Sequence, residues 1–141
     1  MVYVGGVRDR AASDRSIARS LANWSTFGYG RLAVVRQRDG AFLGWVTIEP
    51  ADDPILVGEI EIGWRLMRSA WGEGFGTEAA AAAAAWAFDT IGIERLVAVI
   101  DAENAASVRV AEKIGMSRCG TIADEGRELE LYELRRPVRV D

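Results

Sequence analysis

The sequence predicts an α+β fold of the three-layer α/β kind, in which a mixed, mostly antiparallel central sheet of about six strands is flanked by helices. The middle of the sequence predicts a strand, a helix and a strand, because a helical run separates the strand-like segments Glu59 to Leu66 and Arg95 to Ile100. Two strands joined in this way are parallel, with a right-handed crossover. Turn residues at Asp39-Gly40 and at Asp124 to Gly126 join further strand-like segments. They predict antiparallel hairpins on both sides of the parallel pair.

The first predicted element is a helix that begins after Ser13, which is a typical N-cap residue. Its larger apolar residues fall on one face at helical spacing: Ile17, Leu21 and Trp24. Gly28 and Gly30 end the helix, because glycine readily adopts the left-handed conformation that closes one. Met1 to Gly6, before this helix, is a short apolar run with no further pattern.

Two strands joined by a hairpin turn follow the helix. Arg31 to Gln37 and Ala41 to Glu49 are rich in apolar and β-branched residues, and Asp39-Gly40 lies between them. Gly44 interrupts the second run, which predicts a bulge or a close approach of another segment. Pro50 to Pro54 predicts a loop.

The middle of the chain carries the next strand and the longest apolar helix. Glu59 to Trp64 alternates polar or small residues with apolar ones, which predicts a strand with two different faces. A helix is predicted from about Thr77 to Ile91, with Gly92 as its C-terminal cap. The alanine run inside it favours a helix and lets it lie close on a sheet. We interpret this run as packing rather than chemistry.

The last third of the chain predicts a buried strand, a helix and a hairpin. The segments are a strand at Arg95 to Ile100, a turn at Asp101 to Asn104, a helix at Ala105 to Ile114 closed by Gly115, strands at Ser117 to Ile122 and Glu128 to Leu134, and a charged tail from Arg135 to Asp141. The predicted order is therefore helix, three strands, helix, strand, helix and two strands.

The composition is that of one globular domain over residues 1–141, with 50% apolar and 27% charged residues. A net charge of −4 and the lack of a basic block argue against a nucleic-acid partner. There is no histidine and one cysteine, Cys119, which removes the commonest base, the commonest metal ligand and any internal disulfide. Met1 to Gly6 is too short for a signal peptide, and Ala79 to Ala85 is too short to cross a membrane. We expect a cytoplasmic protein with no metal and no membrane partner.

The glycine-rich stretch Trp71 to Ala79 lies between a predicted strand and a predicted helix, where outward-facing backbone amides favour an anion. A P-loop would need Lys-Ser or Lys-Thr after the last glycine, where this chain has Thr77-Glu78. A dinucleotide fingerprint would need two residues between its last two glycines, where this chain has only Phe75. A cradle for the pyrophosphate of an acyl-coenzyme A and a tight turn without a ligand remain.

Three segments together resemble the GNAT superfamily of N-acetyltransferases. In the first, Glu61-Ile62-Gly63-Trp64 runs into the glycine-rich stretch, whose Gly74 and Gly76 match the small positions of the family motif Gln/Arg-x-x-Gly-x-Gly/Ala. The other two are Asn104-Ala105-Ala106-Ser107 and Glu112-Lys113-Ile114-Gly115-Met116. Trp71 stands where Gln or Arg is usual, which resembles the RimJ/RimL-like branch, the ribosomal-protein-alanine acetyltransferases.

This resemblance implies the acyl-CoA N-acyltransferase fold and transfer of the acetyl group of acetyl-CoA to a primary amine of a protein N-terminus or a small molecule. The implied pyrophosphate site is made of Trp71, Gly72, Glu73, Gly74, Phe75, Gly76 and Thr77. The backbone of Trp64, Arg65 and Leu66 would pair with the pantetheine arm. Asn104 would bond that arm from the other side, or serve as a plain helix N-cap, and Lys113 would reach the phosphates or be solvated.

The attacking amine must lose a proton, and without histidine the candidate bases are carboxylates. Glu59 and Glu61 share one face of the predicted strand beside the expected thioester, or are simply solvated or ion-paired. Many family members carry a tyrosine seven residues after the asparagine, where this chain has Ala111. The resemblance gives Ser107 a hydrogen bond to the coenzyme sulfur. Without histidine Cys119 cannot form a Cys-His pair, so we expect direct attack in a ternary complex.

The family normally opens with a strand and a helix before the segment with which this chain begins. Either the true start lies upstream, or the acceptor side is open, or another subunit covers it, and we expect a sheet edge that favours a homodimer. The alternatives to an enzyme are a CoA-binding module, a truncated non-catalytic relative, and a binder of sugar or nucleotide phosphates. The acceptor would contact the segments with least pattern: Met1 to Gly30, Pro50 to Pro54 and Ala123 to Arg127.

Overall fold

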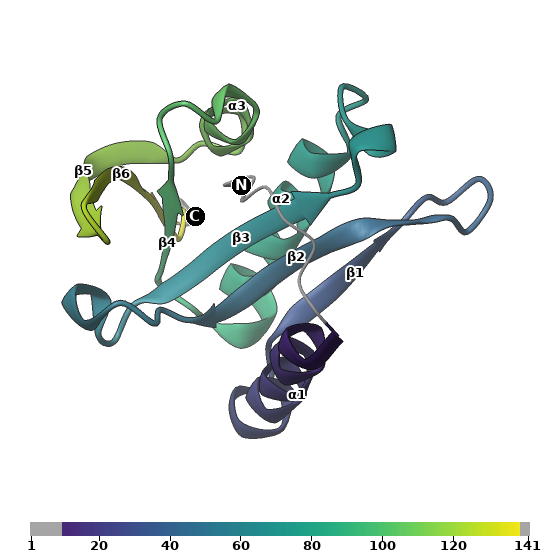
Figure 1. Cartoon of the computed structure of the whole chain (residues 1–141), viewed down its shortest axis with the longest axis horizontal. Coiled ribbons are helices and arrows are strands. Elements are labelled where there is room, and N and C mark those ends of the chain that lie inside the picture. Colours follow the sequence, from purple (N-terminus) through teal and green to yellow (C-terminus); the bar gives the residue numbers. More distant parts are fainter. Residues whose placement is uncertain (1–9, 139–141) are drawn as a thin grey trace.

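The computed structural model describes residues 10–138, and its elements follow the predicted order (Figure 1). They are α1 (Arg10–Phe27), β1 (Arg31–Val35), β2 (Phe42–Pro50), β3 (Ile60–Leu66), α2 (Phe75–Trp86), β4 (Arg95–Ile100), α3 (Ala105–Lys113), β5 (Ser117–Asp124) and β6 (Arg127–Arg135). Single 3-10 turns at Pro54–Leu56 and Arg68–Ala70 come before and after β3, and a turn of π-helix, Ala87–Ile91, continues α2.

The described strands form one six-stranded sheet in the order β1-β2-β3-β4-β6-β5. Strands β3 and β4 are parallel, and every other neighbouring pair is antiparallel, as predicted. The parallel contact is short, because only Ile60 and Glu61 of β3 pair with β4. Beyond Glu61 the two strands diverge (Figure 1), and no residue of β4 pairs with the second half of β3. The sheet is therefore mixed, mostly antiparallel, and open in its middle.

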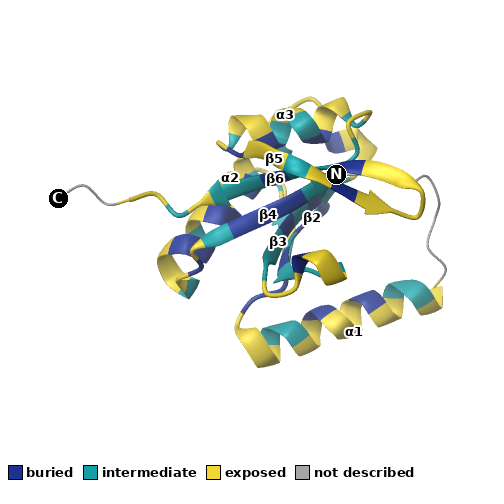
Figure 2. Ribbon diagram, turned by 90° about the vertical axis from the view of Figure 1, so that its left-hand side faces the viewer, coloured by how far each residue is buried: buried dark blue, intermediate teal, exposed yellow. Residues whose placement is uncertain are grey.

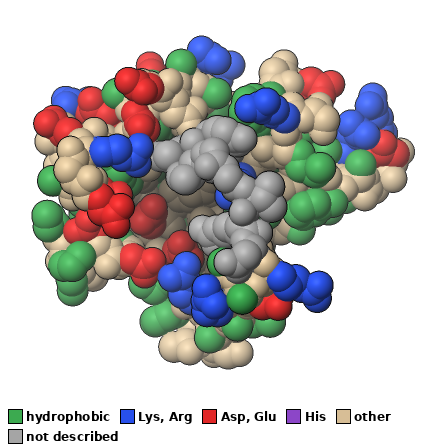
Figure 3. Space-filling view, in the orientation of Figure 1, with side chains coloured by type: hydrophobic (Ala, Val, Ile, Leu, Met, Phe, Trp, Pro, Cys, Tyr) green, Lys and Arg blue, Asp and Glu red, His purple; other side chains and the backbone are tan. Residues whose placement is uncertain are grey.

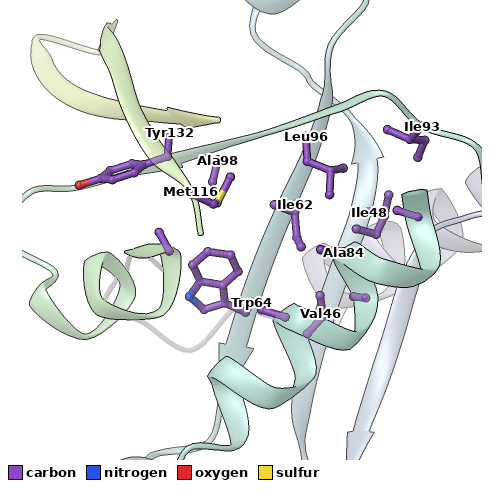
Figure 4. Close-up of a cluster of buried hydrophobic side chains, with 14 of the residues drawn as sticks. Val46, Ile48, Ile62, Trp64, Ala84, Ile93, Leu96, Ala98, Met116 and Tyr132 are labelled. Atoms are coloured by element: carbon purple, nitrogen blue, oxygen red, sulfur yellow. The ribbon is translucent and has the colours of Figure 1, made fainter. Parts of the chain in front are cut away.

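Helix α2 covers the face of the sheet at this opening. Its residues Ala80, Ala83 and Ala84 are buried, and small side chains allow a helix to lie close on a sheet. Figure 4 shows Ala84 beside Ile48 and Ile62, which point inward from β2 and β3. The prediction that the alanine run serves packing is confirmed.

Gly44 marks a close approach of β2 and β3. Its φ is +145°, and a Cβ added there would lie 2.1 Å from the backbone oxygen of Arg65. The register of β1 on β2 also shifts between Val34 and Val35, next to the position paired with Gly44. Both the bulge and the close approach predicted for Gly44 are confirmed.

Helix α1 begins earlier than predicted. Its first residue is Arg10, so Ser13 lies inside the helix rather than at its N-cap, while Gly28, with a φ of 78°, ends it as predicted. The run Met1 to Gly6 lies outside the described residues. None of the helices within residues 10–138 combines the length and the apolar character needed to cross a membrane.

The face that α1 buries also differs from the prediction. Ser16 and Ser20 are its buried residues, whereas Ile17 and Leu21 are 49% and 62% exposed (Figure 2). The reason is Arg31 at the start of β1. Its backbone N–H donates to Ser20 Oγ at 2.8 Å, and its guanidinium donates to Ser16 Oγ. Polar contacts to the sheet edge, rather than the apolar stripe, therefore orient this helix.

Candidate active site

A cavity of about 360 Å³ lies where the end of β3, the glycine-rich stretch, the start of α2 and α3 meet. It brings together most of the predicted cofactor-binding residues: Trp64, Leu66, Trp71, Gly72, Gly74, Phe75, Gly76, Thr77, Asn104, Ser107 and Lys113. Ala106, which belongs to the second family-like segment, also lines the cavity, as do three residues that were not predicted: Ala70, Arg109 and Val110. Arg109 lies four residues before Lys113, so helical spacing from Lys113 was the signal that could have found it.

Two of the predicted cofactor-binding residues, Arg65 and Glu73, do not line this cavity, and neither do the predicted catalytic carboxylates Glu59 and Glu61. Arg65 alternates with Trp64 and Leu66 along β3, and its guanidinium lies 5.8 Å from the ring centre of Trp45. It lines a separate hollow beside that ring. Glu73, which is exposed, is likewise absent from the cavity lining. The backbone of Arg65, not its side chain, was predicted to pair with the pantetheine arm. The position of the side chain therefore does not test that prediction.

The glycine-rich stretch forms an uncapped helix start. Gly72 and Gly74 have φ values of +79° and +83°, in the left-handed region that glycine adopts without strain. Gly74 is the N-cap of α2, and no side chain caps the helix there. A Cβ added at Gly72 or Gly74 would meet nothing within 4 Å, so this side of the loop is open. Free N–H groups at a helix start together with the helix dipole favour an anion.

Trp71 fixes the loop to the end of β3. Its indole Nε1 donates to the backbone oxygen of Leu66 at 2.9 Å, and its side chain is 43% exposed. The guanidinium of Arg68 lies 5.7 Å from the ring centre of Trp71. Trp71 therefore positions the loop by a hydrogen bond within the protein, in addition to lining the cavity.

The start of α3 forms the opposite wall of the cavity. Asn104 is the N-cap of this helix, because its Oδ1 accepts from the backbone N–H of Ser107 at 3.1 Å. This confirms the capping role of Asn104 and leaves its amide N–H groups to other partners. Ser107 is 3% exposed and lines the cavity. Ala111, at the position where a tyrosine is usual in the family, is fully buried in the core.

Trp64 brings a buried polar atom to the cavity. Its side chain is 6% exposed, and no described group accepts a hydrogen bond from its Nε1. Figure 4 shows the indole extending from β3 toward α3. A ligand with hydrogen-bond acceptors would therefore fit this cavity, since it would supply the missing partner.

Glu59 and Glu61 have different surroundings. Glu59 lies just before β3, and its carboxylate pairs with the guanidinium of Arg95 at 2.7 Å; Arg95 also binds Glu133 at 2.6 Å. Glu61 lies on β3 directly opposite Glu49 of β2. Burial, reinforced by the nearby acidic side chains of which Glu49 is the strongest, raises the pKa of Glu61 to about 7. Glu61 therefore has a pKa suited to accepting a proton near neutrality.

A larger hollow, about 760 Å³, lies between β1, β2 and α2 and is lined mainly by aliphatic side chains and Trp86; of the predicted site residues it contains only Phe75. Figure 3 shows the Lys and Arg side chains of one face dispersed rather than gathered in a patch. Cys119 is exposed on β5, outside both hollows, with Arg95 Nη2 3.9 Å from its sulfur.

A mixed sheet that splays between parallel strands, followed by an uncapped glycine turn at a helix start, defines an acyl-CoA N-acyltransferase fold. The family model described as "Acetyltransferase (GNAT) domain" matches residues 1–117. The chain therefore belongs to the GNAT family of acetyltransferases.

Individual relatives agree with this family. The uncharacterized protein YkkB of Bacillus subtilis is 32% identical over 133 residues, which are 94% of this chain and 77% of that protein. An acetyltransferase of known structure from Agrobacterium tumefaciens is 32% identical with a TM-score of 0.78, over 94% of this chain and 75% of that one. The structure of yncA from Salmonella typhimurium with its cofactor acetyl-CoA shares the fold at 20% identity and a TM-score of 0.72, over 92% and 76% of the two chains.

Proposed function

We propose that this protein is an N-acetyltransferase that transfers the acetyl group of acetyl-CoA to a primary amine by direct attack in a ternary complex, and that residues 1–141 form one such domain with a short tail from residue 135. The observation that carries this proposal is the single cavity shared by the glycine-rich stretch, the end of β3 and the start of α3. An anion site at one end and buried polar groups at the other suit a long ligand with phosphates and amide groups.

Acetyl-CoA supplies an activated acetyl group, and the chain's own residues bind and orient it. The backbone N–H groups from Gly72 to Thr77 hold the pyrophosphate, and the open side of Gly74 leaves room for it. The second half of β3 has no partner in β4, so its backbone is available to the pantetheine arm. Asn104 contacts the arm through its amide N–H groups, and Arg109 and Lys113 on α3 reach toward the phosphates.

Glu61 is the general base in this proposal, acting directly or through a water molecule. Its raised pKa, about 7, allows the carboxylate to accept a proton from an ammonium near neutral pH. Glu59 is held by Arg95 and contributes charge balance rather than proton transfer. Ser107, buried at the cavity wall, provides a hydrogen bond to the coenzyme sulfur.

The acceptor is an amine, either a protein N-terminus, as in the RimJ/RimL-like branch, or a small cationic molecule. Acetyltransferases with different acceptors share this fold at low identity: ribosomal-protein-S5-alanine acetyltransferase of Vibrio fischeri at 16%, and a mutant of spermidine N-acetyltransferase SpeG of Vibrio cholerae at 16%. The acidic side chains that raise the pKa of Glu61 include Glu49, Asp52 and Asp53. They favour an acceptor that carries a positive charge before it is deprotonated.

A steady-state assay tests this function. Release of the coenzyme thiol from acetyl-CoA is measured with an amino-terminal alanine peptide, an amino-terminal serine peptide and spermidine. We expect amine-dependent release, intersecting double-reciprocal lines, and full activity in Cys119→Ser. Parallel lines with an inactive Cys119→Ser would indicate an acyl-cysteine instead. Tight binding of acetyl-CoA without turnover of any amine would favour a CoA-binding module.

We also propose that two copies associate through the edge of β1. Strand β1 pairs with β2 on one side and has no strand on the other within residues 10–138. Side chains of α1 bind the backbone of Arg31 at this edge, so the part of β1 that follows Arg31 is the proposed template for another chain. Sedimentation velocity at increasing protein concentration tests this, and a single monomeric species throughout would contradict it.

A further inference from the structure

The indole N–H of Trp64 is a donor that the described residues do not use. The side chain is more than nine-tenths buried, and Nε1 has no acceptor. Burial removes an N–H from water, so nearly all such groups in proteins have a partner. Even indoles that are less buried have acceptors: the partly buried Trp24 donates to the oxygen of Arg31 at 3.1 Å, and the exposed Trp71 to that of Leu66 at 2.9 Å.

The position of Trp64 shows that its indole N–H faces the cavity. Side chains alternate along β3, so Ile62, Trp64 and Leu66 share a face that Glu61 does not. Figure 4 shows the indole nitrogen on the side of the ring that faces α3. Trp64 lines the cavity together with Asn104 and Ser107 of the α3 start. The donor therefore meets the molecule that fills the cavity, and not the acceptor amine beside Glu61.

The chemistry of the donor limits its partner. An indole Nε1–H can only donate, and a carbonyl oxygen is a much better acceptor than a thioether or thioester sulfur. An acyl-coenzyme A offers carbonyl oxygens in the amides of its pantetheine arm and in its thioester. A phosphate partner is disfavoured, because the uncapped amides at Gly74 already provide the anion site at the far end of the cavity.

We propose that Trp64 Nε1 donates a hydrogen bond to a carbonyl oxygen of the bound acyl-coenzyme A, and that Trp64 thereby positions the acyl arm between β3 and α3. This inference rests on the proposed binding of acetyl-CoA. Trp64 exchanges no proton with the ligand and makes no bond to it, so it is a positioning residue. The same contact explains why a tryptophan, rather than an apolar residue of the core, occupies this buried position.

The test follows the indole N–H signals of the ¹⁵N-labelled protein, which has five tryptophans. Trp64→Phe assigns one signal; if that variant does not fold, Phe variants of the other four tryptophans assign it by exclusion. Trp86→Phe is the matched control, because it makes the same replacement in the hollow between β1 and α2. Calorimetric titrations of both variants use acetyl-CoA and free coenzyme A.

We expect saturation with acetyl-CoA to move the Trp64 proton signal downfield and slow its exchange with water. Trp64→Phe should bind acetyl-CoA roughly three- to tenfold more weakly than Trp86→Phe, because it loses one hydrogen bond to the ligand. A loss confined to acetyl-CoA assigns the bond to the thioester carbonyl, and an equal loss with coenzyme A assigns it to an arm amide.

Binding by the wild type with an unmoved Trp64 signal would overturn this inference alone. Equal affinities of the two variants would do the same. No binding of acetyl-CoA by the wild type would instead overturn the proposed function, and this inference with it.

Discussion

Glu59 and Glu61 lie on the same predicted strand, but their partners give the two carboxylates different properties. Arg95 holds Glu59 at 2.7 Å, whereas Glu61 faces Glu49 across the sheet. The sequence could not distinguish the two glutamates, because their partners lie on other strands: Arg95 on β4 and Glu49 on β2. These different surroundings are the reason why Glu61, rather than Glu59, is the proposed base.

The pH dependence of catalysis follows from this choice. The pKa of Glu61 is raised from 4.5 to about 7, so the carboxyl is protonated below neutrality and becomes a base only above it. We expect kcat/KM to rise as the pH increases through 7. Glu61→Gln should lower kcat by roughly 10²- to 10⁴-fold and abolish this ascending limb. An unchanged limb in Glu61→Gln would assign the pH dependence to another group.

The same group predicts a dependence of stability on pH. Because the folded-state pKa of Glu61 lies above the unfolded value, its stabilising contribution is complete below pH 4.5 and is lost as the pH rises through 7. Glu61→Gln should therefore be more stable than the wild type at pH 8 by on the order of 1–3 kcal/mol, with a much smaller difference at pH 4.5. Urea unfolding at the two pH values measures this, and a constant difference would contradict it.

Gly44 predicts a second effect of a single residue. Gly44→Ala would place a Cβ 2.1 Å from the oxygen of Arg65 at a φ of +145°, so the backbone of β2 or β3 must move. We expect a loss of roughly 2–4 kcal/mol in the free energy of unfolding. Gly120→Ala is the control, because a Cβ there meets nothing within 4 Å. Similar losses in the two variants would show that the close approach has no energetic weight.

At the scale of elements, the contact between α1 and β1 explains how the helix is held. The backbone N–H of Arg31 donates to Ser20, and its carbonyl accepts from Trp24. These are backbone groups at the outer edge of the sheet, which would otherwise lack a partner strand. Side chains of α1 thus replace part of a missing ladder, and the helix need not bury Ile17 or Leu21.

This contact predicts the effect of Ser20→Ala. The variant leaves the Arg31 N–H without its acceptor at a partly buried edge, so we expect about 0.5–1.5 kcal/mol lower stability and faster exchange of that amide. Ser25→Ala, on the exposed part of the same helix, should change stability by a few tenths of a kcal/mol at most. Equal values for both serines would mean that the contact does not anchor α1.

For the whole molecule, local patterns in the sequence predicted the order and type of the elements, because turn residues, glycine caps and hydrophobic period are local signals. The glycine-rich stretch likewise indicated one end of the site. Patterns could not show that β3 and β4 pair only at Ile60 and Glu61 and then diverge. They also predicted the wrong buried face for α1. An apolar stripe predicts the buried face only when polar contacts, such as those with Arg31, do not orient the helix. Helical spacing from Lys113 could have indicated Arg109, but its place in the cavity wall depends on how α3 lies against the loop.

The measurement that tests the central claim most directly compares acetyl-CoA binding by Gly74→Asp and Gly74→Asn. Both residue types tolerate the left-handed conformation, and a Cβ at Gly74 meets nothing within 4 Å, so the variants differ mainly in one negative charge at the head of α2. If the pyrophosphate lies on this loop, the Asp variant should bind at least about tenfold more weakly than the Asn variant, with a smaller gap at high salt. Equal affinities would contradict the account and place the coenzyme elsewhere.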